Sequence, residues 1–239
     1  VEAVALGEDV QHVDLPPKTA QERLTGHQFT EARRHGKMVF AGSRSGPWMA
    51  VHLGMTGSLV LWEEGEGTPD YARITLVFEG ARRLSWLTRR KLGWVRVIDD
   101  PDTFVAEEGY GPDALAIGRA AVGRRLGRGM IKPALMDQSK LAGIGNLWSD
   151  EILFQTGTAP DARAADLSPE RIGAIHGAMR RLLRRAVEVG ADYGALPADW
   201  LIHNRKEGAR CPRCGGTIAK KTVGGRTAYH CPGHQRAAA

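Results

Sequence analysis

Two features are scarce in this chain: cysteines and long apolar runs. Three cysteines among 239 residues are too few for a disulfide scaffold, and the first of them is Cys211. This count favours metal binding in a reducing compartment. No apolar stretch reaches the roughly 18 residues that a membrane-spanning helix needs, so no membrane partner is expected. The first residues carry Glu2, Glu8 and Asp9 without an apolar block, unlike a secretory signal peptide. A cytoplasmic protein is therefore predicted.

Acidic side chains are scarce in the second half of the chain. Residues 1–110 hold 13 basic and 16 acidic side chains, whereas residues 111–239 hold 20 basic and 11 acidic ones. This asymmetry predicts two domains, of which the second mainly grips a polyanionic partner. Solvated arginine faces would give the same composition, so charge alone leaves both interpretations open.

The first half has the pattern of a β domain. Short runs with partial alternation, separated by glycine-rich or acidic turns, predict strands. They are Trp48–Leu53, Leu59–Trp62, Arg73–Phe78, Arg83–Leu87 and Trp94–Ile98. Several short strands at this spacing favour a sandwich or barrel. Residues 99–118 are rich in aspartate, glycine and proline, which predicts a loop at a domain boundary.

The second half has the pattern of a helical domain. Ser168-Pro169-Glu170 supplies a cap, a proline at the first helical position and an acid in the first turn. An apolar stripe follows over residues 172–187, and Gly190 is expected to end this helix. Shorter helices are predicted over Leu115–Leu126 and Leu147–Phe154.

The spacing of cysteine and histidine is the most specific signal. Cys211 and Cys214 form one pair, Cys231 and His234 form another, and 16 residues separate the pairs. Two pairs with two residues inside each suit tetrahedral Zn²⁺. Four protein ligands leave no open position, so one structural Zn²⁺ is expected. The alternative is a coincidence of free thiols and a surface histidine.

Two further segments are candidates for contact with a polyanion. The segment between the ligand pairs predicts a β-hairpin that turns at Gly224-Gly225, with Lys220, Lys221 and Arg226 directed at phosphates. Gly143-Ile-Gly-Asn146 precedes a predicted helix, whose N-terminal N–H groups can hold a phosphate oxygen. A solvated hairpin and an ordinary turn are the alternatives.

Four blocks in this sequence, taken together, resemble the formamidopyrimidine-DNA glycosylase / endonuclease VIII family. They are His52-Leu-Gly-Met55-Thr-Gly-Ser-Leu59 with Arg33-Arg34-His35-Gly36-Lys37 upstream, Arg89-Arg90-Lys91-Leu92-Gly93, the segment from Ile131-Lys132-Pro133 to Glu151, and Asn204-Arg205-Lys206 with the cysteine-rich hairpin. The resemblance implies an α+β fold. It has an N-terminal β-sandwich at 1–108, a helix-two-turn-helix domain at 109–202, and a β-hairpin zinc finger at 203–239.

The resemblance also implies a function. Members are base-excision-repair DNA glycosylases with abasic-site lyase activity, which flip a damaged nucleotide out of duplex DNA bound between the domains. A monomer associated with the bacterial nucleoid is expected. The residues implied to contact DNA are Lys37, His52, Met55, Arg90, Lys91, Leu92, Lys132, Asn146, Arg205, Lys206 and Arg226.

Some of these positions have ordinary alternatives. Met55 matches a wedge that fills the vacated base stack, although methionine commonly fills cores. Leu92 matches a void-filling position where the family more usually has an aromatic residue. Lys37 and Lys132 match phosphate ligands but could be solvated surface lysines, and Asn146 could be a helix cap.

The family's catalytic segment has no counterpart in the printed sequence. Members begin with Pro-Glu-Leu-Pro, whose proline amine attacks the sugar and forms a Schiff base. This chain begins Val1-Glu2-Ala3-Val4, which resembles the family's first strand, so no catalytic residue is assigned. A misplaced start and a truncated, non-catalytic paralogue that binds abasic or damaged DNA are both consistent with this. An RNA-binding or translation-linked zinc protein is disfavoured by the Met55 loop and the β domain.

Overall fold

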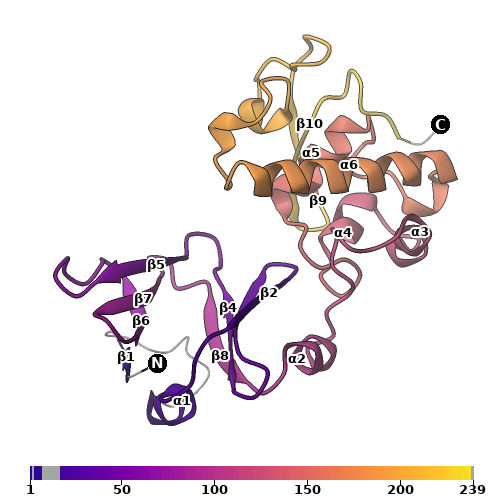
Figure 1. Cartoon of the computed structure of the whole chain (residues 1–239). Helices are drawn as coiled ribbons and strands as arrows, with labels where there is room; N and C mark the ends of the chain where they lie inside the picture. The colour runs from indigo at the N-terminus through magenta and orange to yellow at the C-terminus, as the bar shows by residue number, and fades with distance from the viewer. Residues whose placement is uncertain (2, 7–16, 238–239) are drawn as a thin grey trace. The chain divides into compact units, whose positions relative to one another are not determined.

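A computed structural model describes residues 1, 3–6 and 17–237. The chain divides into two compact units, Val1–Gly109 and Tyr110–Ala239, called here the N-terminal and C-terminal units (Figure 1). Glu2, Glu8 and Asp9, which argued against a signal peptide, lie outside the described residues. Among the described helices, none combines the length and the apolar character needed to span a bilayer.

The N-terminal unit contains two antiparallel four-stranded sheets, with strand orders β1-β6-β7-β5 and β2-β3-β4-β8. The strands are β1 (Ala3–Leu6), β2 (Glu31–His35), β3 (Met38–Gly42), β4 (Trp48–His52), β5 (Ser58–Glu63), β6 (Ala72–Val77), β7 (Arg82–Leu87) and β8 (Trp94–Ile98). The five predicted strands are confirmed to within a residue at each end. The strand β2 was missed because its sequence, Glu-Ala-Arg-Arg-His, has no apolar alternation and its middle is exposed.

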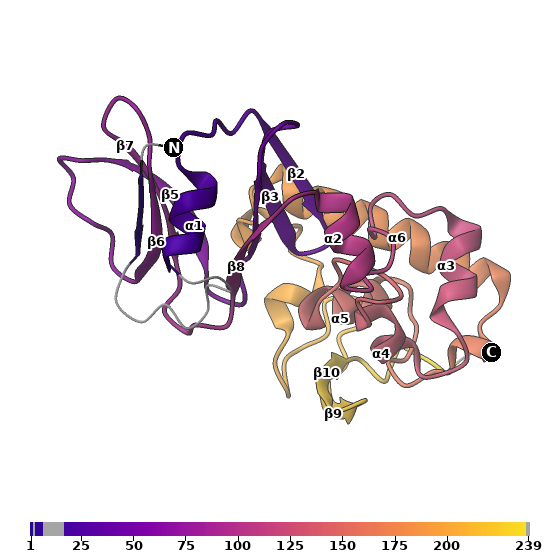
Figure 2. The same cartoon turned by 90° about the horizontal axis from the view of Figure 1, so that it is seen from below.

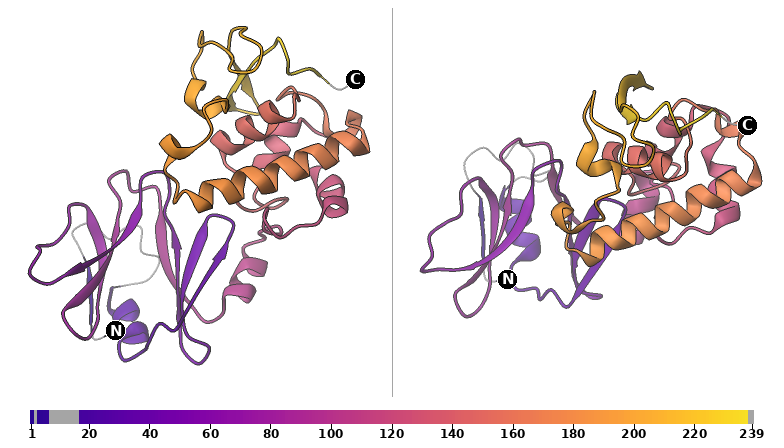
Figure 3. Two further views of the ribbon diagram at one scale, coloured as in Figure 1. Left: turned by 45° about the horizontal axis from the view of Figure 1, so that its top comes forward. Right: turned by 90° about the horizontal axis from the view of Figure 1, so that it is seen from above.

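One buried cluster joins the two sheets. Ile74 and Trp86 from one sheet pack with Val51 and Val95 from the other, so the unit is a β-sandwich, as predicted. The helix α1 (Pro17–Leu24) adds buried Leu24 to the same cluster and contacts β1 in one sheet and β8 in the other (Figure 3). The burial of apolar side chains between the two sheets is the main contribution to the stability of this unit.

The predicted loop over residues 99–118 is corrected by the structure, because it contains helix α2 (Pro101–Glu107). The Asp100 side chain accepts a hydrogen bond from Thr103 N at 2.7 Å, and Pro101 occupies the first helical turn. These are helix-start signals, and the sequence carried them. Phe104 then packs edge-on against Phe40, which fixes the helix on the sandwich.

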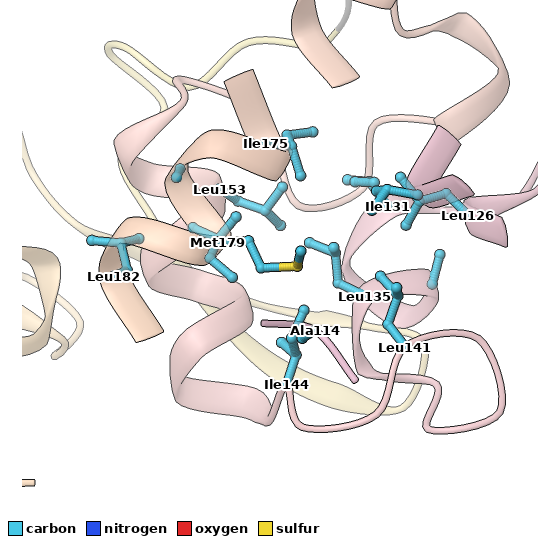
Figure 4. Close-up of a cluster of buried hydrophobic side chains, with 14 of the residues drawn as sticks. Ala114, Leu126, Ile131, Leu135, Leu141, Ile144, Leu153, Ile175, Met179 and Leu182 are labelled. Atoms are coloured by element: carbon cyan, nitrogen blue, oxygen red, sulfur yellow. The ribbon is translucent and has the colours of Figure 1, made fainter. Parts of the chain in front are cut away.

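The C-terminal unit is helical with a two-stranded sheet. Its elements are α3 (Arg119–Leu126), α4 (Ile131–Met136), α5 (Asn146–Gln155), η1 (Ala164–Asp166), α6 (Pro169–Glu188), η2 (Tyr193–Ala195), η3 (Leu201–Asn204), β9 (Ala219–Val223) and β10 (Arg226–His230). Figure 4 shows the apolar core, in which Leu153 of α5 and Met179 of α6 lie among side chains from α3 and α4.

Helix α6 and the hairpin form as predicted. Ser168 Oγ accepts a hydrogen bond from Arg171 N at 3.2 Å and caps α6, and Gly190 follows the helix with a φ of +60°. The strands β9 and β10 turn at Gly224-Gly225. Helix α5 contacts α4, α6, η3 and β10, and it is therefore the central element of this unit (Figure 2).

Candidate nucleic-acid interface and metal centre

Two loops of the N-terminal unit meet and expose apolar side chains. Gly54 has a φ of +69°, and a Cβ there would lie 2.8 Å from Gly93 N, so glycine is required for this close approach. Met55 is 72% exposed and Leu92 is 51% exposed. The Arg90 guanidinium lies 3.7 Å from Met55 Sδ. Met55 is therefore an exposed tip beside an arginine and does not fill the core.

Lys37, a predicted phosphate ligand, and His52, a predicted DNA contact, lie close to these loops. The ladder between β3 and β4 pairs Met38 with His52, which brings Lys37 near the imidazole. His52 stacks on Trp94 with ring centroids 5.8 Å apart, and its Nδ1 accepts a hydrogen bond from Gly54 N at 3.2 Å. Burial lowers the pKa of His52, and the charge of Lys37 lowers it further. The neutral ring therefore presents Nε2–H as a donor.

Lys91 completes the predicted positions of the N-terminal unit. Its φ of +51° is unusual for a residue with a side chain. It lies between Arg90 and Leu92, so this tight turn sets the directions of both neighbouring side chains. The sequence analysis did not detect this backbone conformation.

Lys132, a predicted phosphate ligand, lies inside the C-terminal unit. Its side chain is fully buried, and Nζ donates to Asp150 Oδ1 at 2.5 Å and to Ser149 Oγ at 3.2 Å. Burial lowers the pKa of Lys132, against the opposing effect of Asp150. Lys132 is thus not a solvated surface lysine. It lies beneath the first turn of α5, where its Nζ is 3.4 Å from Asn146 O.

Asn146 begins helix α5 but does not cap it, because Gly145 is the N-cap residue. The Asn146 Oδ1 atom is buried and has no hydrogen-bond partner among the described residues. The first N–H groups of a helix lack intrahelical acceptors, and the Lys132 ammonium lies under the same turn. This turn therefore carries positive electrostatic potential suited to an anion.

Asp150 is a buried carboxylate with partners from three other segments. Besides Lys132, it accepts hydrogen bonds from Arg205 Nη2 at 2.8 Å and from Tyr229 N at 3.3 Å. The Arg205 guanidinium also lies 4.8 Å from the centre of the Tyr229 ring. Arg205, predicted to contact DNA, is therefore held by internal partners. Asp150 joins α4, the segment after η3 and the hairpin.

Glu151 is the second buried acid of α5, and no role was predicted for it. Its carboxylate accepts hydrogen bonds from Leu201 N at 3.2 Å and Ile202 N at 2.9 Å, and Gln155 also donates to it. Burial raises the pKa of Glu151 despite these hydrogen bonds. The carboxylate anchors the start of η3, which leads to Asn204 and the exposed Lys206.

The hairpin turn packs closely on helix α4. Gly224 has a φ of +56°, and a Cβ there would lie 2.4 Å from Pro133 Cγ. Lys221 pairs with Asp161, in the segment between α5 and η1, at 2.7 Å. Lys220 and Arg226 are exposed. Of the three predicted hairpin cations, two therefore face solvent and one has an internal partner.

The four predicted metal ligands converge. Their ligand atoms all lie within 4.8 Å of one another, and the residues are Cys211, Cys214, Cys231 and His234. Cys214 Sγ is 3.4 Å from Cys231 Sγ, and Cys211 Sγ is 3.6 Å from His234 Nδ1. A tetrahedral ion bonded to sulfur at about 2.3 Å and to nitrogen at about 2.0–2.1 Å separates its ligands by about 3.5–3.8 Å. The geometry fits a metal site.

The surroundings also orient the ligands. His234 Nε2 lies 3.1 Å from the Phe154 carbonyl oxygen at the end of α5, so Nε2 carries the proton and Nδ1 is left for a metal. A Cβ at Gly216 or Gly233 would lie 3.3 Å from Cys214 Sγ, so both glycines leave room around the sulfur. Without a metal, burial raises the pKa of the Cys231 thiol to about 11, and a bound cation would favour its thiolate.

Comparison with known proteins decides the family. The model described as Formamidopyrimidine-DNA glycosylase N-terminal domain matches residues 1–95, and the Formamidopyrimidine-DNA glycosylase H2TH domain matches residues 115–195. A protein of Roseiflexus sp. named formamidopyrimidine-DNA glycosylase is 32% identical over 228 residues, which cover 89% of this chain and 83% of that protein. The chain belongs to the formamidopyrimidine-DNA glycosylase family.

Two further family relatives extend the comparison. A formamidopyrimidine-DNA glycosylase of Nitratidesulfovibrio vulgaris is 35% identical over 203 residues, and the chain covers 55% of its length. The crystal structure of a Lactococcus lactis mutant enzyme in complex with Fapy-dG containing DNA matches with a TM-score of 0.85 at 25% identity. That match covers 98% of this chain and 92% of the other.

Proposed function

We propose that this protein is a base-excision-repair DNA glycosylase with abasic-site lyase activity, acting on damaged bases in duplex DNA. The observation that best supports this proposal is the 32% sequence identity to the Roseiflexus glycosylase across most of both chains. Base flipping is the physical requirement, because the sugar and base are inaccessible while the nucleotide stays stacked.

The exposed loop residues supply a wedge for the vacated stack. Met55 and Leu92 present apolar surface to solvent, and Arg90 lies against Met55. Inserting apolar side chains offsets part of the unstacking cost of a few kcal/mol. Leu92 has less area for stacking than an aromatic ring, so selection of the opposite base depends more on Arg90.

The phosphate ligands of the proposed interface are hydrogen-bond donors and cations. Lys37, His52 and Lys91 serve from the N-terminal unit. Asn146, Lys206 and Arg226 serve from the C-terminal unit. Lys132 and Arg205 act indirectly, because both are held by Asp150. Contacts of this kind position the duplex and do not read its sequence.

The metal of this site is proposed to be one structural Zn²⁺. Three sulfurs and one imidazole nitrogen match its preferences, and four protein ligands leave no position for a substrate. Cys211 and Cys231 are buried beside Phe154 and Ile218, so the metal would stabilise the hairpin against α5. We further propose that the protein acts as a monomer on nucleoid DNA.

Borohydride trapping tests the chemistry. The full-length gene product is incubated with labelled duplex containing one abasic site, and borohydride reduces any Schiff base to a stable crosslink. We expect a crosslinked band and strand cleavage without borohydride. A protein that binds the abasic duplex yet never crosslinks would refute lyase activity.

Binding of abasic or damaged DNA without chemistry is the second candidate. It is favoured by the fact that the wedge and phosphate positions described above need no nucleophile to hold a distorted duplex. The two candidates predict the same affinity for a stable abasic analogue. They differ in trapping, because only the enzyme forms a covalent bond to the sugar.

A further inference from the structure

Helix α6 carries a row of arginines on the face turned away from the core. Ile175, Met179 and Leu182 are buried and define the inner face. Arg180, Arg181, Arg184 and Arg185 occupy positions i, i+1, i+4 and i+5. Residues four apart on a helix lie about 6 Å apart along its axis. The arginines therefore form two adjacent columns on one side of the helix.

These arginines line a groove with a volume of about 800 Å³. The opposite wall comes from the segment after η2 and contains Pro197, Asp199 and Trp200. Gly177 lies one turn before the arginines and also lines the groove, and a Cβ there would meet no atom within 4 Å. The site is therefore a concave surface with open space over Gly177.

The groove has a net positive lining, because its four arginines outnumber the two carboxylates, Glu188 and Asp199. Arg185 pairs with Glu188 at 3.3 Å. Over the part of the chain that the structure describes, no carboxylate lies within ion-pair distance of Arg180, Arg181 or Arg184. The Arg180 Nε–H group is buried and also lacks a hydrogen-bond partner there. A guanidinium donor shielded from water without an acceptor is unfavourable, so an acceptor that reached it would stabilise this arginine.

This groove is separate from the hairpin surface within the C-terminal unit. Helix α5 contacts both α6 and β10, and Figure 2 shows α5 between α6 and the hairpin. A duplex held by Arg226 on the hairpin therefore does not occupy the arginine groove of α6. The two cationic surfaces can each meet a different polyanion segment.

We propose that the α6 groove binds the phosphate backbone of a second DNA segment, so that one protein bridges two duplexes. The planar guanidinium fork matches phosphate oxygens. A duplex presents about one charge per 1.7 Å of axis, which supplies several acceptors to the two arginine columns at once. The choice of DNA as the polyanion rests on the proposed function, whereas the existence of the groove does not.

Gly177→Glu tests the groove without disturbing the fold. A glutamate there faces Arg180 and Arg181 at i+3 and i+4, an arrangement that stabilises a helix, and glutamate favours helix more than glycine does. Its carboxylate competes with phosphate for the same arginines. Gly177→Gln has the same shape without the charge and is the matched control.

The measurement has two steps. Each protein is first saturated with a short duplex that carries a stable abasic analogue, and a labelled intact duplex is then titrated while anisotropy is followed. We expect the wild type and Gly177→Gln to bind the second duplex. We expect Gly177→Glu to bind it about tenfold more weakly, with a salt slope reduced by about 1.8 if two phosphate contacts are lost.

The possible results distinguish a failure of the proposed function from a failure of the groove proposal. If the short abasic duplex does not bind, the proposed function is wrong. The groove is then tested without the first step, by titrating the intact duplex directly against the three proteins. If the second duplex does not bind the wild type, or binds Gly177→Glu equally well, the groove proposal is wrong. If poly-glutamate binds the groove and excludes the second duplex at equal charge concentration, the occupant is an acidic polypeptide and the assignment to DNA is overturned.

Discussion

At the scale of single residues, Asp150 is a buried carboxylate that joins Lys132, Arg205 and the backbone of Tyr229. It balances Lys132 and Arg205 from inside the protein, where water cannot replace a lost partner. Removing one member of a buried charge network costs about 3–5 kcal/mol. The same carboxylate therefore holds two of the residues predicted to contact DNA.

We expect Asp150→Asn to lower the free energy of unfolding of the C-terminal unit by about 3–5 kcal/mol, because Lys132 is left buried without a counter-charge. Chemical denaturation followed by far-UV circular dichroism measures this change. Adding Lys132→Met should restore part of the loss. The exposed Asp166 provides a control, since Asp166→Asn should change stability by less than about 0.5 kcal/mol. Equal effects of the two Asn variants would contradict the account.

His52 gives the N-terminal unit a dependence on pH. Burial places the folded pKa of His52 below its ordinary value, so the unfolded chain binds more protons below about pH 6.5. The stabilising contribution of the neutral ring is therefore present above the unfolded pKa and is lost as the pH falls through that window.

The test compares the wild type with His52→Gln between about pH 7.5 and about pH 5.5, using denaturation followed by tryptophan fluorescence, since Trp94 stacks on His52. The wild type should lose more stability than the variant over this range. A variant with an undiminished pH dependence would show that His52 is not the responsible group.

At the scale of elements, sequence patterns correctly located those strands and helix starts that depend on local chemistry. Alternation placed β4 to β8, and the cap at Ser168 placed the start of α6. The strand β3 was missed, because its sequence, Met-Val-Phe-Ala-Gly, is apolar throughout and does not show the alternation that its burial does. Helix α2 was missed because its aspartates and proline were interpreted as loop signals.

Long-range contacts were not predictable from the sequence. Arg205 and Asp150 are 55 residues apart, and Glu151 caps η3 from 50 residues away. Which lysine becomes buried depends on how α4 packs on α5, and no local pattern encodes that packing. The metal ligands were predictable because paired spacing itself limits the geometry.

The hairpin turn permits a matched test of element packing. Gly224 and Gly225 both have positive φ, but only a Cβ on Gly224 would meet Pro133, at 2.4 Å. We expect Gly225→Ala to cost about 1 kcal/mol from backbone strain. Gly224→Ala should cost at least about 1 kcal/mol more and weaken DNA binding, as measured by thermal unfolding and gel shift. Identical behaviour of the two variants would exclude packing of the turn on α4.

At the scale of the whole molecule, the proposed metal would link the hairpin to the helical core. His234 lies against the carbonyl of Phe154 in α5, and the same helix presents Asp150 to the hairpin strand β10. Loss of the metal should therefore release the hairpin from both contacts. The hairpin has a small apolar core of its own, so the proposed metal would supply much of its folding free energy.

We expect Cys231→Ser to purify with less than one equivalent of zinc and to lose tight binding to DNA, whereas Thr222→Ala on the exposed face of β9 should retain both. Elemental analysis and gel shift give the two readouts. A Cys231→Ser protein with one full equivalent of zinc would contradict the assigned ligand set.

The most direct measurement of the central claim is the affinity of the zinc-loaded protein for a duplex with a stable abasic analogue, compared with the intact duplex at the same salt concentration. The account predicts a preference of about a hundredfold, because the damaged strand costs less to unstack and admits the Met55 wedge. Equal affinity for the two duplexes would contradict it.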